Sequence, residues 1–401
     1  MPSPYVLLRG PGWKLPEPLE LREPLEVLEV AADRPEELPR LVERLDAVAR
    51  SGRPELVAAG FLTYEAGVAL EGSTALFRPP PTPLAWFGLF DLRSAVPRGG
   101  SAVAPSIRPD FARGDLREGP FDPACEMTLE EWSAAVSEIR AGIERGDVYQ
   151  ANLTRRVVRE LPVSPRRLAD LLYGDNPVPY AVLVEMGASA VVSNSPELFL
   201  ELDPVSRRVA SAPIKGTVAR TAGGSEAAAR ALLLSSEKDA AEHLMIVDLV
   251  RNDLGRACRP GSVHVPALRS VKSYRHLHHL ESTVAGSLVP GAGLSDLLLA
   301  TLPAGSITGA PKRSALEFIR RLEPAPRGPY TGAAGFVRGD GTAVLNVAIR
   351  TAIVSGGAVA YHAGGGIVWD SDPRHEWEES ETKSREFFRA LAVAAGESEV
   401  R

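Results

Sequence analysis

Hydrophobic and polar positions follow a helical period in several stretches of the chain. The segments 35–52 and 128–147 each place their apolar residues on one stripe and end near a glycine, which predicts amphipathic helices. The segment 236–255 carries apolar residues on more than one side, which is typical of a buried helix. An Asp-Pro pair opens the segment 372–395 and predicts a final helix there, because proline is favoured in the first helical turn.

Apolar runs bounded by turn residues predict strands. Such runs lie at 56–67, where the strand is expected to enter a glycine turn, and at 151–161, 180–186, 189–195, 197–203 and 209–215. The segment 335–369 contains two hairpin turns, at Gly339-Asp340-Gly341 and at Ser355-Gly356-Gly357. Long antiparallel strands interrupted by helices, rather than alternating strands and helices, predict an α+β fold.

Length and a Pro/Gly-rich stretch bear on the domain organisation. A chain of 401 residues exceeds what one ordinary core holds, and this suggests two domains or one large elaborated domain. The stretch from Val96 to Pro123 has no apolar period and is interpreted as a linker or long surface loop. We therefore divide the chain into residues 1–120 and residues 121–401.

Charge and cysteine content exclude several classes of protein. The formal net charge is -6, from 45 basic and 51 acidic residues, whereas nucleic-acid binding requires a basic surface. No apolar run approaches the ~20 residues of a membrane helix, and the N-terminus lacks the pattern of a signal peptide. Cys125 and Cys258 lie far apart in the sequence and do not predict a disulfide framework. We expect a cytoplasmic protein with no nucleic-acid partner and no membrane partner.

Two acidic pairs are candidates for a metal site. Asp239 and Glu242 are three residues apart on one predicted helix, and Glu376 and Glu379 have the same spacing on another, so each pair shares a helix face. Oxygen ligands on two helices suit Mg²⁺, which also takes oxygens from an anionic substrate. The alternative is a solvated helix face, and for the C-terminal pair a simple ion pair between Glu379 and Lys383.

Four further positions invite a chemical interpretation, and each has an ordinary alternative. Lys215 ends an apolar run, where burial would lower the pKa of its amine and make it a nucleophile, although an isolated lysine usually lies at the surface. Arg350 interrupts an apolar run and needs an anion, from a substrate or from the protein. The glycines Gly364 to Gly366 bring a backbone close to a ligand or mark a bulge. His279 lies in a run without zinc-ligand spacing, and a structural histidine is the default.

Nine motifs resemble, in their order along the chain, those of the chorismate-utilising enzymes. The motifs are GDVYQANLT, SPELFL, PIKGT, AEHLMIVDLVRNDLGR, HHLES, GSITGAPK, YTGAAGF, AIRT and AGGGIVWDSDP. The resemblance covers about residues 125–395 and thins upstream to residues 60–67. It implies an α+β fold of two large antiparallel sheets packed at a steep angle with flanking helices, as in anthranilate synthase component I. Residues 121–401 would then form the chorismate-binding catalytic domain, and residues 1–120 would contribute to the same body.

The resemblance also implies roles for individual residues. Glu242 and Glu379 match the Mg²⁺ ligands, with Asp239 and Glu376 in the same acidic site, and the metal holds the ring carboxylate of chorismate. The enolpyruvyl carboxylate is expected to be bound by Arg350, Tyr330, Gly364 and Gly365. The general acid that protonates the departing ring hydroxyl matches Glu197, and the histidine near that hydroxyl matches His279.

Two positions distinguish subgroups of this family. Isochorismate and salicylate synthases usually carry a water-activating lysine where this chain has Gln150, so the resemblance favours an amine-using enzyme. Anthranilate synthases usually read Pro-Ile-Ala-Gly-Thr, whereas aminodeoxychorismate synthases read Pro-Ile-Lys-Gly-Thr, as this chain does at Lys215 and Thr217. The resemblance therefore implies a lysine that adds to the ring before ammonia arrives, with Gln150 and Thr217 among the substrate-binding residues.

The source of ammonia is expected to be a separate glutamine amidotransferase. Hydrolysis of glutamine by relatives of that partner uses a cysteine on a Gly-x-Cys-x-Gly turn, and neither Cys125 nor Cys258 has glycines on both sides. Two alternatives stay open. Anthranilate synthase component I would make Lys215 a bystander, and a non-catalytic binding or regulatory relative would keep only the fold.

Overall fold

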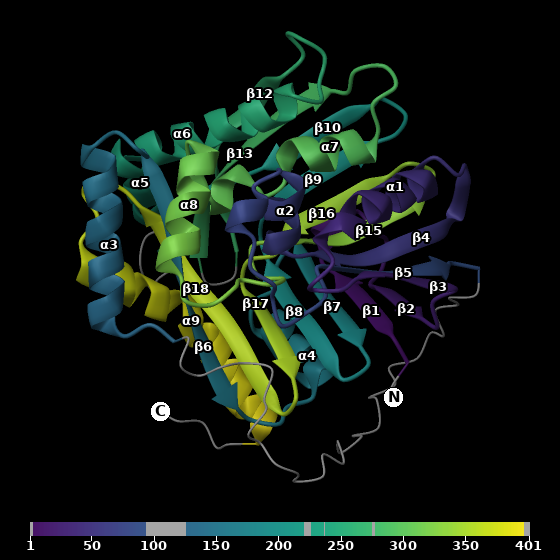
Figure 1. Cartoon of the computed structure of the whole chain (residues 1–401), viewed down its shortest axis with the longest axis horizontal. Coiled ribbons are helices and arrows are strands. Elements are labelled where there is room, and N and C mark those ends of the chain that lie inside the picture. The colour runs from purple at the N-terminus through teal and green to yellow at the C-terminus, as the bar shows by residue number, and fades with distance from the viewer. Residues whose placement is uncertain (1–2, 94–125, 220–225, 236, 275–276, 397–401) are drawn as a thin grey trace.

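Two antiparallel sheets form the centre of the protein (Figure 1). The computed structural model describes residues 3–93, 126–219, 226–235, 237–274 and 277–396. Strands of the two sheets run in clearly different directions in Figure 1, and helices lie outside them. The predicted α+β class with two large antiparallel sheets is confirmed.

Within the described residues the first sheet has eight strands, all paired with antiparallel neighbours. In spatial order they are β14 (Gly309–Ala310), β6 (Gln150–Glu160), β18 (Ala358–Ile367), β17 (Thr351–Ser355), β8 (Ser189–Ser195), β7 (Tyr180–Met186), β1 (Tyr5–Arg9) and β2 (Leu19–Arg22).

The second sheet has ten strands in the part of the chain that the structure describes. In spatial order they are β11 (Ile214–Ala219), β13 (Leu277–Ser287), β10 (Arg208–Ala212), β9 (Leu198–Asp203), β16 (Ala343–Val347), β15 (Ala333–Gly339), β4 (Arg53–Leu62), β5 (Ala85–Asp91) and β3 (Glu26–Val30), with β12 (His264–Ser273) paired to β13.

Helices cover the outer faces of both sheets. They are α1 (Leu38–Ala49), α2 (Tyr64–Leu70), α3 (Leu129–Glu144), α4 (Pro165–Asp175), α5 (Glu226–Ser235), α6 (Glu237–Gly255), α7 (Leu294–Thr301), α8 (Lys312–Leu322) and α9 (Pro373–Ala395). Helix α9 packs along β18, and α3 packs against α9, whereas α5 and α6 pack on β11 and β13.

Residues near the N-terminus supply strands to both sheets. Strands β1 and β2 extend the first sheet, and β3, β4 and β5 belong to the second. Between the sheets lies a core that includes Trp13, Phe61 and Phe336, all buried. The Trp13 indole Nε1 donates to the carbonyl of Arg9 at 2.9 Å and to that of Ala181 at 3.1 Å, so its polar atom is satisfied. The linker expected at 96–123 and the boundary near residue 120 lie outside the described residues.

Several helices agree with their sequence signals. Helix α3 begins with a capping box, in which the Thr128 side chain accepts from the Glu131 N–H and Glu131 accepts in return from Thr128. Helix α9 spans Pro373–Ala395, and its cap Asp372 accepts from two backbone N–H groups, each at 3.0 Å. The predicted helices at 35–52, 128–147 and 372–395 are confirmed, with small differences at their ends.

Three local predictions are wrong. The run 209–215 forms two strands, β10 and β11, because Pro213 between them has no N–H for the ladder. The run at 56–67 ends in helix α2 rather than in a glycine turn, because the Thr63 side chain caps that helix by accepting from Ala66 N–H at 3.0 Å. Helix α6 is not buried on every side, since Leu244 is 48% exposed.

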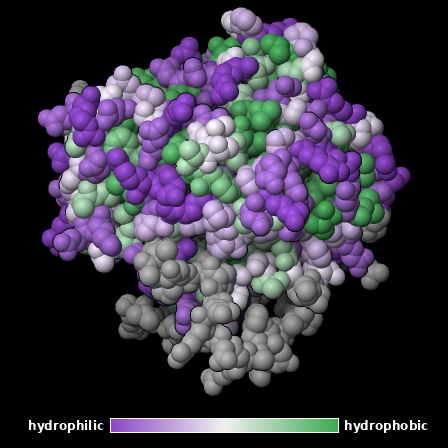
Figure 2. All heavy atoms as spheres, in the orientation of Figure 1, coloured by the Kyte–Doolittle hydropathy of each residue, from purple (hydrophilic) through white to green (hydrophobic). Residues whose placement is uncertain are grey.

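Most of the outer surface in one view is polar with scattered apolar patches (Figure 2). None of the helices within the described residues combines the length and the apolar character needed to cross a lipid bilayer.

Candidate active site

The first residues of β11 hold the centre of the candidate site. Lys215 is part-buried, and its Nζ lies 2.5 Å from Glu242 Oε2 of α6. Burial on its own lowers the pKa of Lys215, but the carboxylates of Glu242, Glu379 and Glu376 outweigh it, and the pKa is raised. The sequence-based expectation of a lowered pKa is therefore wrong, because it took no account of carboxylates facing the amine.

Helix α6 is tied to β11 and β13 by a residue next to Glu242. The His243 Nε2 lies 2.5 Å from Ser282 Oγ, and its Nδ1 lies 3.4 Å from the Lys215 carbonyl oxygen. His243 and Ser282 are both buried. Neither residue stands out in the sequence, although both lie inside motifs that resemble those of the family. Their contacts fix the helix position that brings Glu242 to Lys215.

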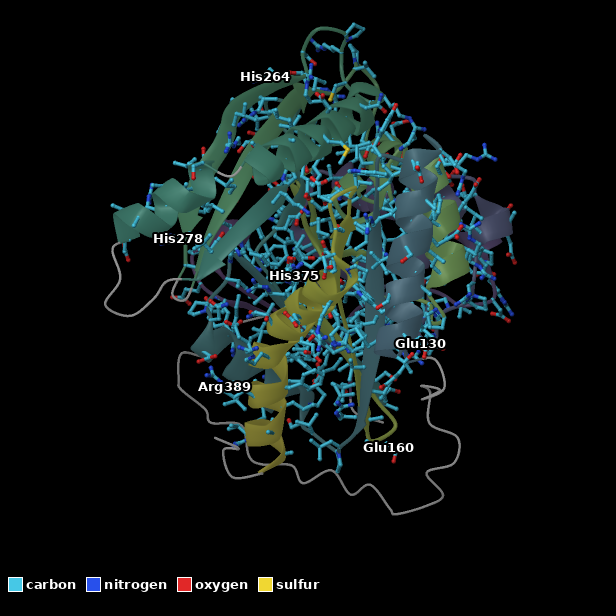
Figure 3. All side chains as sticks on the ribbon, turned by 90° about the vertical axis from the view of Figure 1, so that its left-hand side faces the viewer. Glu130, Glu160, His264, His278, His375 and Arg389 are labelled. Atoms are coloured by element: carbon cyan, nitrogen blue, oxygen red, sulfur yellow. The ribbon has the colours of Figure 1, made fainter. Side chains whose placement is uncertain are left out.

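The second acidic pair lies at the N-terminal end of α9. Figure 3 shows His375, in the first turn of α9, near the middle of the molecule, whereas Arg389 lies toward the bottom of the view. A Cβ atom added to Gly365 would lie 3.5 Å from Glu376 Oε2 and 3.6 Å from Glu379 Oε1. Both carboxylates therefore face the glycine segment of β18. Because they also raise the pKa of Lys215, they share one acidic site with Glu242.

Side chains of the protein also bind Glu376 and Glu379. The Ser371 hydroxyl donates to Glu376 Oε1 at 2.7 Å. Lys383 Nζ lies 2.6 Å from Glu379 Oε1 and donates to the Gly364 carbonyl at 2.8 Å. The expected Glu379–Lys383 ion pair is therefore confirmed. It does not exclude the metal interpretation, because Glu379 is 56% exposed and remains open to solvent on other sides.

The donor set has the chemistry that Mg²⁺ prefers. Glu242, Glu376 and Glu379 supply hard carboxylate oxygens from two helices, and Mg²⁺ usually takes one or two carboxylates together with water and substrate oxygens. Within the described residues no three side chains already lie close enough to hold a metal by themselves. Asp239 lies in α6 and Thr217 in β11, but their side chains are outside the described part of the structure. The residues thus fit a shared metal–substrate site rather than a closed cage.

Glu197 is a buried carboxyl group suited to donate a proton. It is 3% exposed, and burial raises its pKa to about 8, with a further increase from Glu281. The Ser306 hydroxyl donates to Glu197 Oε1 at 2.7 Å, and a backbone hydrogen bond from Ile214 also reaches the carboxyl group. Glu197 is therefore mostly protonated at neutral pH, as a general acid must be.

His279 is a buried neutral imidazole. Burial is the largest cause that lowers its pKa to about 3, and the nearby Arg350 lowers it further. A hydrogen bond with the Gly216 backbone opposes these effects. The ring packs edge-on against Tyr274 at 5.6 Å between centroids. Since Ile214 contacts Glu197 and Gly216 contacts His279, three consecutive residues of β11 bring Glu197, Lys215 and His279 together.

Comparison with known proteins identifies the family of this chain. A family model described as chorismate binding enzyme matches residues 21–389. The chain belongs to the chorismate-binding enzyme family. It is 39% identical over 310 residues to anthranilate synthase component 1 1 of Haloarcula marismortui, across 76% of this chain and 61% of that protein. It is 38% identical over 279 residues to aminodeoxychorismate synthase component 1 of Bacillus subtilis (strain 168), across 69% of this chain and 59% of that protein.

A solved structure gives the same result for the fold. Anthranilate synthase component I from Streptococcus pneumoniae TIGR4 matches with a TM-score of 0.75 and 26% identity, over 97% of this chain and 93% of that chain. The expected likeness to anthranilate synthase component I is therefore confirmed for the fold. The chain spans about three fifths of the length of the curated relatives that it matches.

Arg350 and Tyr330 lie in segments of the chain that connect the two sheets. Arg350 is not inside a strand, as the sequence suggested, but in the connection between β16 and β17, with a positive φ of 50°. Its Nη1 lies 4.0 Å from Glu386 Oε2 of α9, and its side chain is 23% exposed. Tyr330 is buried and stacks on His362 with 5.1 Å between ring centroids. An internal carboxylate is thus within reach of Arg350, and the partly exposed guanidinium remains accessible to a second anion.

The three glycines form part of a strand rather than a loop. Residues 364–366 continue β18 in unbroken register with β6, so the interpretation as a bulge is wrong. A Cβ on Gly366 would overlap Gln150 Nε2, so the bare backbone makes room for that side chain. Gln150 is 2% exposed, and its Nε2 donates to Asn152 Oδ1 at 3.2 Å. Among the described residues its Oε1 has no hydrogen-bond partner, which leaves a buried acceptor beside the glycine strand.

Proposed function

We propose that this protein is a chorismate-aminating enzyme, aminodeoxychorismate synthase component I, which converts chorismate and ammonia to 4-amino-4-deoxychorismate. The observation that carries the proposal is the position of Lys215, whose amine enters the acidic site and pairs with Glu242 at 2.5 Å. A lysine exposed on the strand surface would have been a bystander. Here the preceding residue, Ile214, hydrogen-bonds to the buried acid Glu197, and the Lys215 amine faces the carboxylates that suit a metal-bound substrate.

The site supports a two-step replacement of the ring hydroxyl. Before the first step the Lys215 ammonium, whose pKa is raised by the facing carboxylates, gives one proton to solvent, because only the neutral amine is a nucleophile. The amine then forms a C–N bond to the ring, the bond between ring carbon and hydroxyl breaks, and Glu197 gives its proton to the departing oxygen, which leaves as water. In the second step ammonia forms a C–N bond at the carbon that lost the hydroxyl, the lysine leaves, and the surplus proton of ammonia returns to a base. The sum is chorismate plus ammonia giving 4-amino-4-deoxychorismate plus water.

Mg²⁺ would be held by Glu242, Glu376 and Glu379, with Asp239 on the same helix as Glu242. When bound there, it supplies positive charge that binds the ring carboxylate of chorismate and offsets the carboxylates that raise the pKa of Lys215. Arg350 and Tyr330, with the bare backbone at Gly364 and Gly365, would receive the enolpyruvyl carboxylate, because guanidinium groups bind carboxylates with two parallel hydrogen bonds.

Gln150 supports ammonia rather than water as the second nucleophile. Its buried Oε1 accepts hydrogen bonds but cannot take a proton at neutral pH, so it can orient N–H donors without activating water. His279 is held neutral by burial and would contact the departing hydroxyl without adding a charge.

A separate glutamine amidotransferase would supply the ammonia. Cys258 is buried, and burial raises its pKa to about 11, so it is a poor nucleophile at neutral pH. Cys125 lies outside the described residues. We expect the isolated chain to use ammonium salts, best at alkaline pH where free ammonia is more abundant, and to be inactive with glutamine until the amidotransferase is added.

Anthranilate synthase component I is the second candidate, because several similar relatives carry that name. Product analysis separates the two, since anthranilate formation releases pyruvate and 4-amino-4-deoxychorismate keeps its enolpyruvyl group. The test is incubation of purified protein with chorismate, Mg²⁺ and ammonium sulfate, followed by mass spectrometry. Anthranilate as the main product would overturn the proposal, and no consumption of chorismate would favour a non-catalytic relative.

The metal assignment is tested with the same assay. Glu242→Gln and Glu379→Gln should each lower turnover strongly while the protein stays folded, because each removes one charge from the acidic site. Titration of Mg²⁺ should restore wild-type activity after treatment with a chelator. Full activity of wild type and both variants in excess chelator would contradict the assignment.

A further inference from the structure

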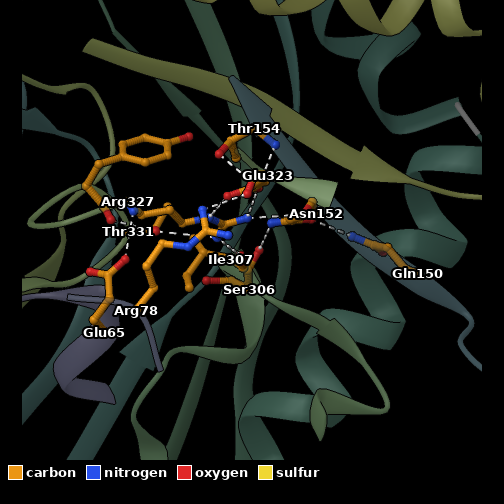
Figure 4. A network of polar contacts seen from close by, with 11 residues as sticks. Glu65, Arg78, Gln150, Asn152, Thr154, Ser306, Ile307, Glu323, Arg327 and Thr331 are labelled. Carbon is orange, nitrogen blue, oxygen red and sulfur yellow. Dashed lines mark hydrogen bonds and ion pairs between the residues drawn. The ribbon is translucent and has the colours of Figure 1, made fainter. Parts of the chain in front are cut away.

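A buried ionic cluster lies beside the candidate active site and has no part in the chemistry proposed above (Figure 4). We call Glu65, Glu323 and Arg327 the support cluster. Arg327 is 1% exposed and Glu323 is 5% exposed. The guanidinium donates to both Glu323 oxygens, from Nε at 2.8 Å and from Nη2 at 2.6 Å. Glu323 Oε1 also accepts from the backbone and hydroxyl of Thr154 on β6, at 2.8 and 3.0 Å.

Glu65 joins the cluster from the N-terminal part of the chain. It lies in α2, is 4% exposed, and accepts from two successive backbone N–H groups. Its Oε1 accepts from Arg327 N–H at 2.7 Å and its Oε2 from Gly328 N–H at 2.9 Å. The Glu65 carboxylate thus fixes the backbone at Arg327, and Glu323 fixes the guanidinium at the end of the same side chain.

The other donors of Arg327 reach the short 3-10 turn η6 (Gly305–Ile307) and strand β6. Nη1 donates to the Ile307 carbonyl at 2.9 Å and Nη2 to the Asn152 carbonyl at 3.1 Å. Asn152 in turn donates from Nδ2 to the Ser306 carbonyl at 3.1 Å. The turn is therefore held at two successive carbonyl groups, that of Ser306 by Asn152 and that of Ile307 by Arg327.

The hydroxyl of Ser306 is the end of this chain of contacts. It donates to Glu197 Oε1 at 2.7 Å. The same Asn152 side chain accepts from Gln150 Nε2 at 3.2 Å. The side-chain amide of Asn152 therefore links Gln150 with Ser306, the residue whose hydroxyl donates to Glu197 (Figure 4).

We propose that the support cluster is a positioning unit, which holds the η6 turn so that Ser306 fixes Glu197 in the orientation needed for proton transfer. This rests on the proposed role of Glu197 as general acid. A buried ion cluster costs desolvation energy and is often no more stabilising than apolar side chains of similar volume. Its use here is geometric, because a displacement of about 1 Å can cost about 100-fold in rate.

The experiment compares one remote and one direct variant with a matched control. Glu65→Gln keeps the size of the side chain but replaces one of its two acceptor oxygens by an NH₂ group, which opposes a backbone N–H. Ser306→Ala removes the hydroxyl, and Ser306→Thr keeps one. Val68→Ala is the control, because Val68 is 3% exposed on the same helix as Glu65 and its truncation disturbs packing without touching the hydrogen bonds.

Each variant is assayed with chorismate, Mg²⁺ and ammonium sulfate by following chorismate consumption, and its melting temperature is measured. Glu65→Gln and Ser306→Ala should each lower kcat by about 10- to 100-fold with little change in KM, and Ser306→Thr should recover part of the loss. Val68→Ala should lower the melting temperature but leave kcat unchanged. The double variant that combines Glu65→Gln with Ser306→Ala should be no slower than Ser306→Ala alone, because both changes act through the Ser306 hydroxyl.

Wild-type kcat in folded Glu65→Gln, or losses that simply multiply in the double variant, would overturn the proposal. Glu197→Gln is measured in parallel to separate this outcome from failure of the proposed function. If Glu197→Gln is inactive and the Glu65 and Ser306 variants are not impaired, only the positioning role is wrong. If Glu197→Gln is fully active, the acid assignment fails and the positioning role fails with it.

Discussion

Replacing Glu197 by glutamine should stabilise the protein increasingly as the pH rises, while removing its activity. Burial raises the pKa of Glu197 from 4.5 to about 8. Below the unfolded value of 4.5 both states are protonated and the group has no effect on stability. Above it the unfolded state loses a proton that the folded state keeps, so the folded state loses relative stability until the pH passes the folded pKa near 8.

The size of the effect follows from this difference in pKa. Integrating the two titrations gives a cost to the wild type of about 1 kcal/mol at pH 5, about 3 kcal/mol at pH 7 and about 5 kcal/mol at pH 9. Glutamine does not titrate and still offers an oxygen to the Ser306 hydroxyl. The folded pKa of about 8 already includes the effect of Glu281, which raises the pKa of Glu197.

Urea denaturation of wild type and Glu197→Gln at pH 5, 7 and 9 measures the difference directly. The free energy of unfolding of the variant should rise relative to wild type by about 4 kcal/mol between pH 5 and pH 9. Glu201→Gln is the control: Glu201 lies in β9, which follows Glu197 directly, and it is 22% exposed and pairs with Lys14 at the surface. Its loss should cost at most about 1 kcal/mol. A difference independent of pH would refute the reasoning that Glu197 is held protonated by burial.

The remaining predictions concern turnover and product. Lys215→Ala should nearly abolish 4-amino-4-deoxychorismate formation, with any residual product shifted toward anthranilate, and an unchanged product rate by chromatography would make the lysine a bystander. Arg350→Lys should mainly raise KM for chorismate, because a lysine ammonium cannot form the two parallel hydrogen bonds of a guanidinium. An unchanged KM with a large drop in melting temperature would instead show that Arg350 serves only in an ion pair within the protein. Gly366→Ala should lower kcat because its Cβ displaces Gln150, whereas Gly174→Ala, with open space at that position, should be neutral in the same assay.

Sequence patterns predicted the parts of the fold that depend on neighbouring residues. The cap at Asp372 and the acidic pair Glu376 and Glu379 follow from spacing along one helix, and the structure places all of them on α9 as expected. The strand predicted at 209–215 is divided at Pro213, because the pattern of apolar residues takes no account of the N–H group that proline lacks. The pKa of Lys215 was predicted in the wrong direction, because the sequence does not show which carboxylates of α6 and α9 face it.

The support cluster could not be predicted from the sequence, because its residues are brought together only by the tertiary structure. Glu323 and Arg327 have helical spacing, but prolines at 324 and 326 follow the end of α8, so the pair closes across an irregular turn. Glu65 is more than 250 residues away from both in the chain, and no local pattern connects them. Ser306 lies in the GSITGAPK motif, and only the tertiary structure shows that its hydroxyl faces Glu197.

The place of β4 in the second sheet has a consequence for the synthesis of the chain. Strand β4 pairs with β15, with Ala59 opposite Phe336, so about 275 residues must be made after one strand before the other exists. At about 5–20 residues per second this takes about 15 to 55 s. During that time an apolar strand, buried in the finished protein over most of its length, has β5 on one side and nothing to pair with on the other. Folding of this sheet is therefore a late event that depends on nearly the whole chain, and we expect chaperones that shield apolar strands to increase the yield of native protein.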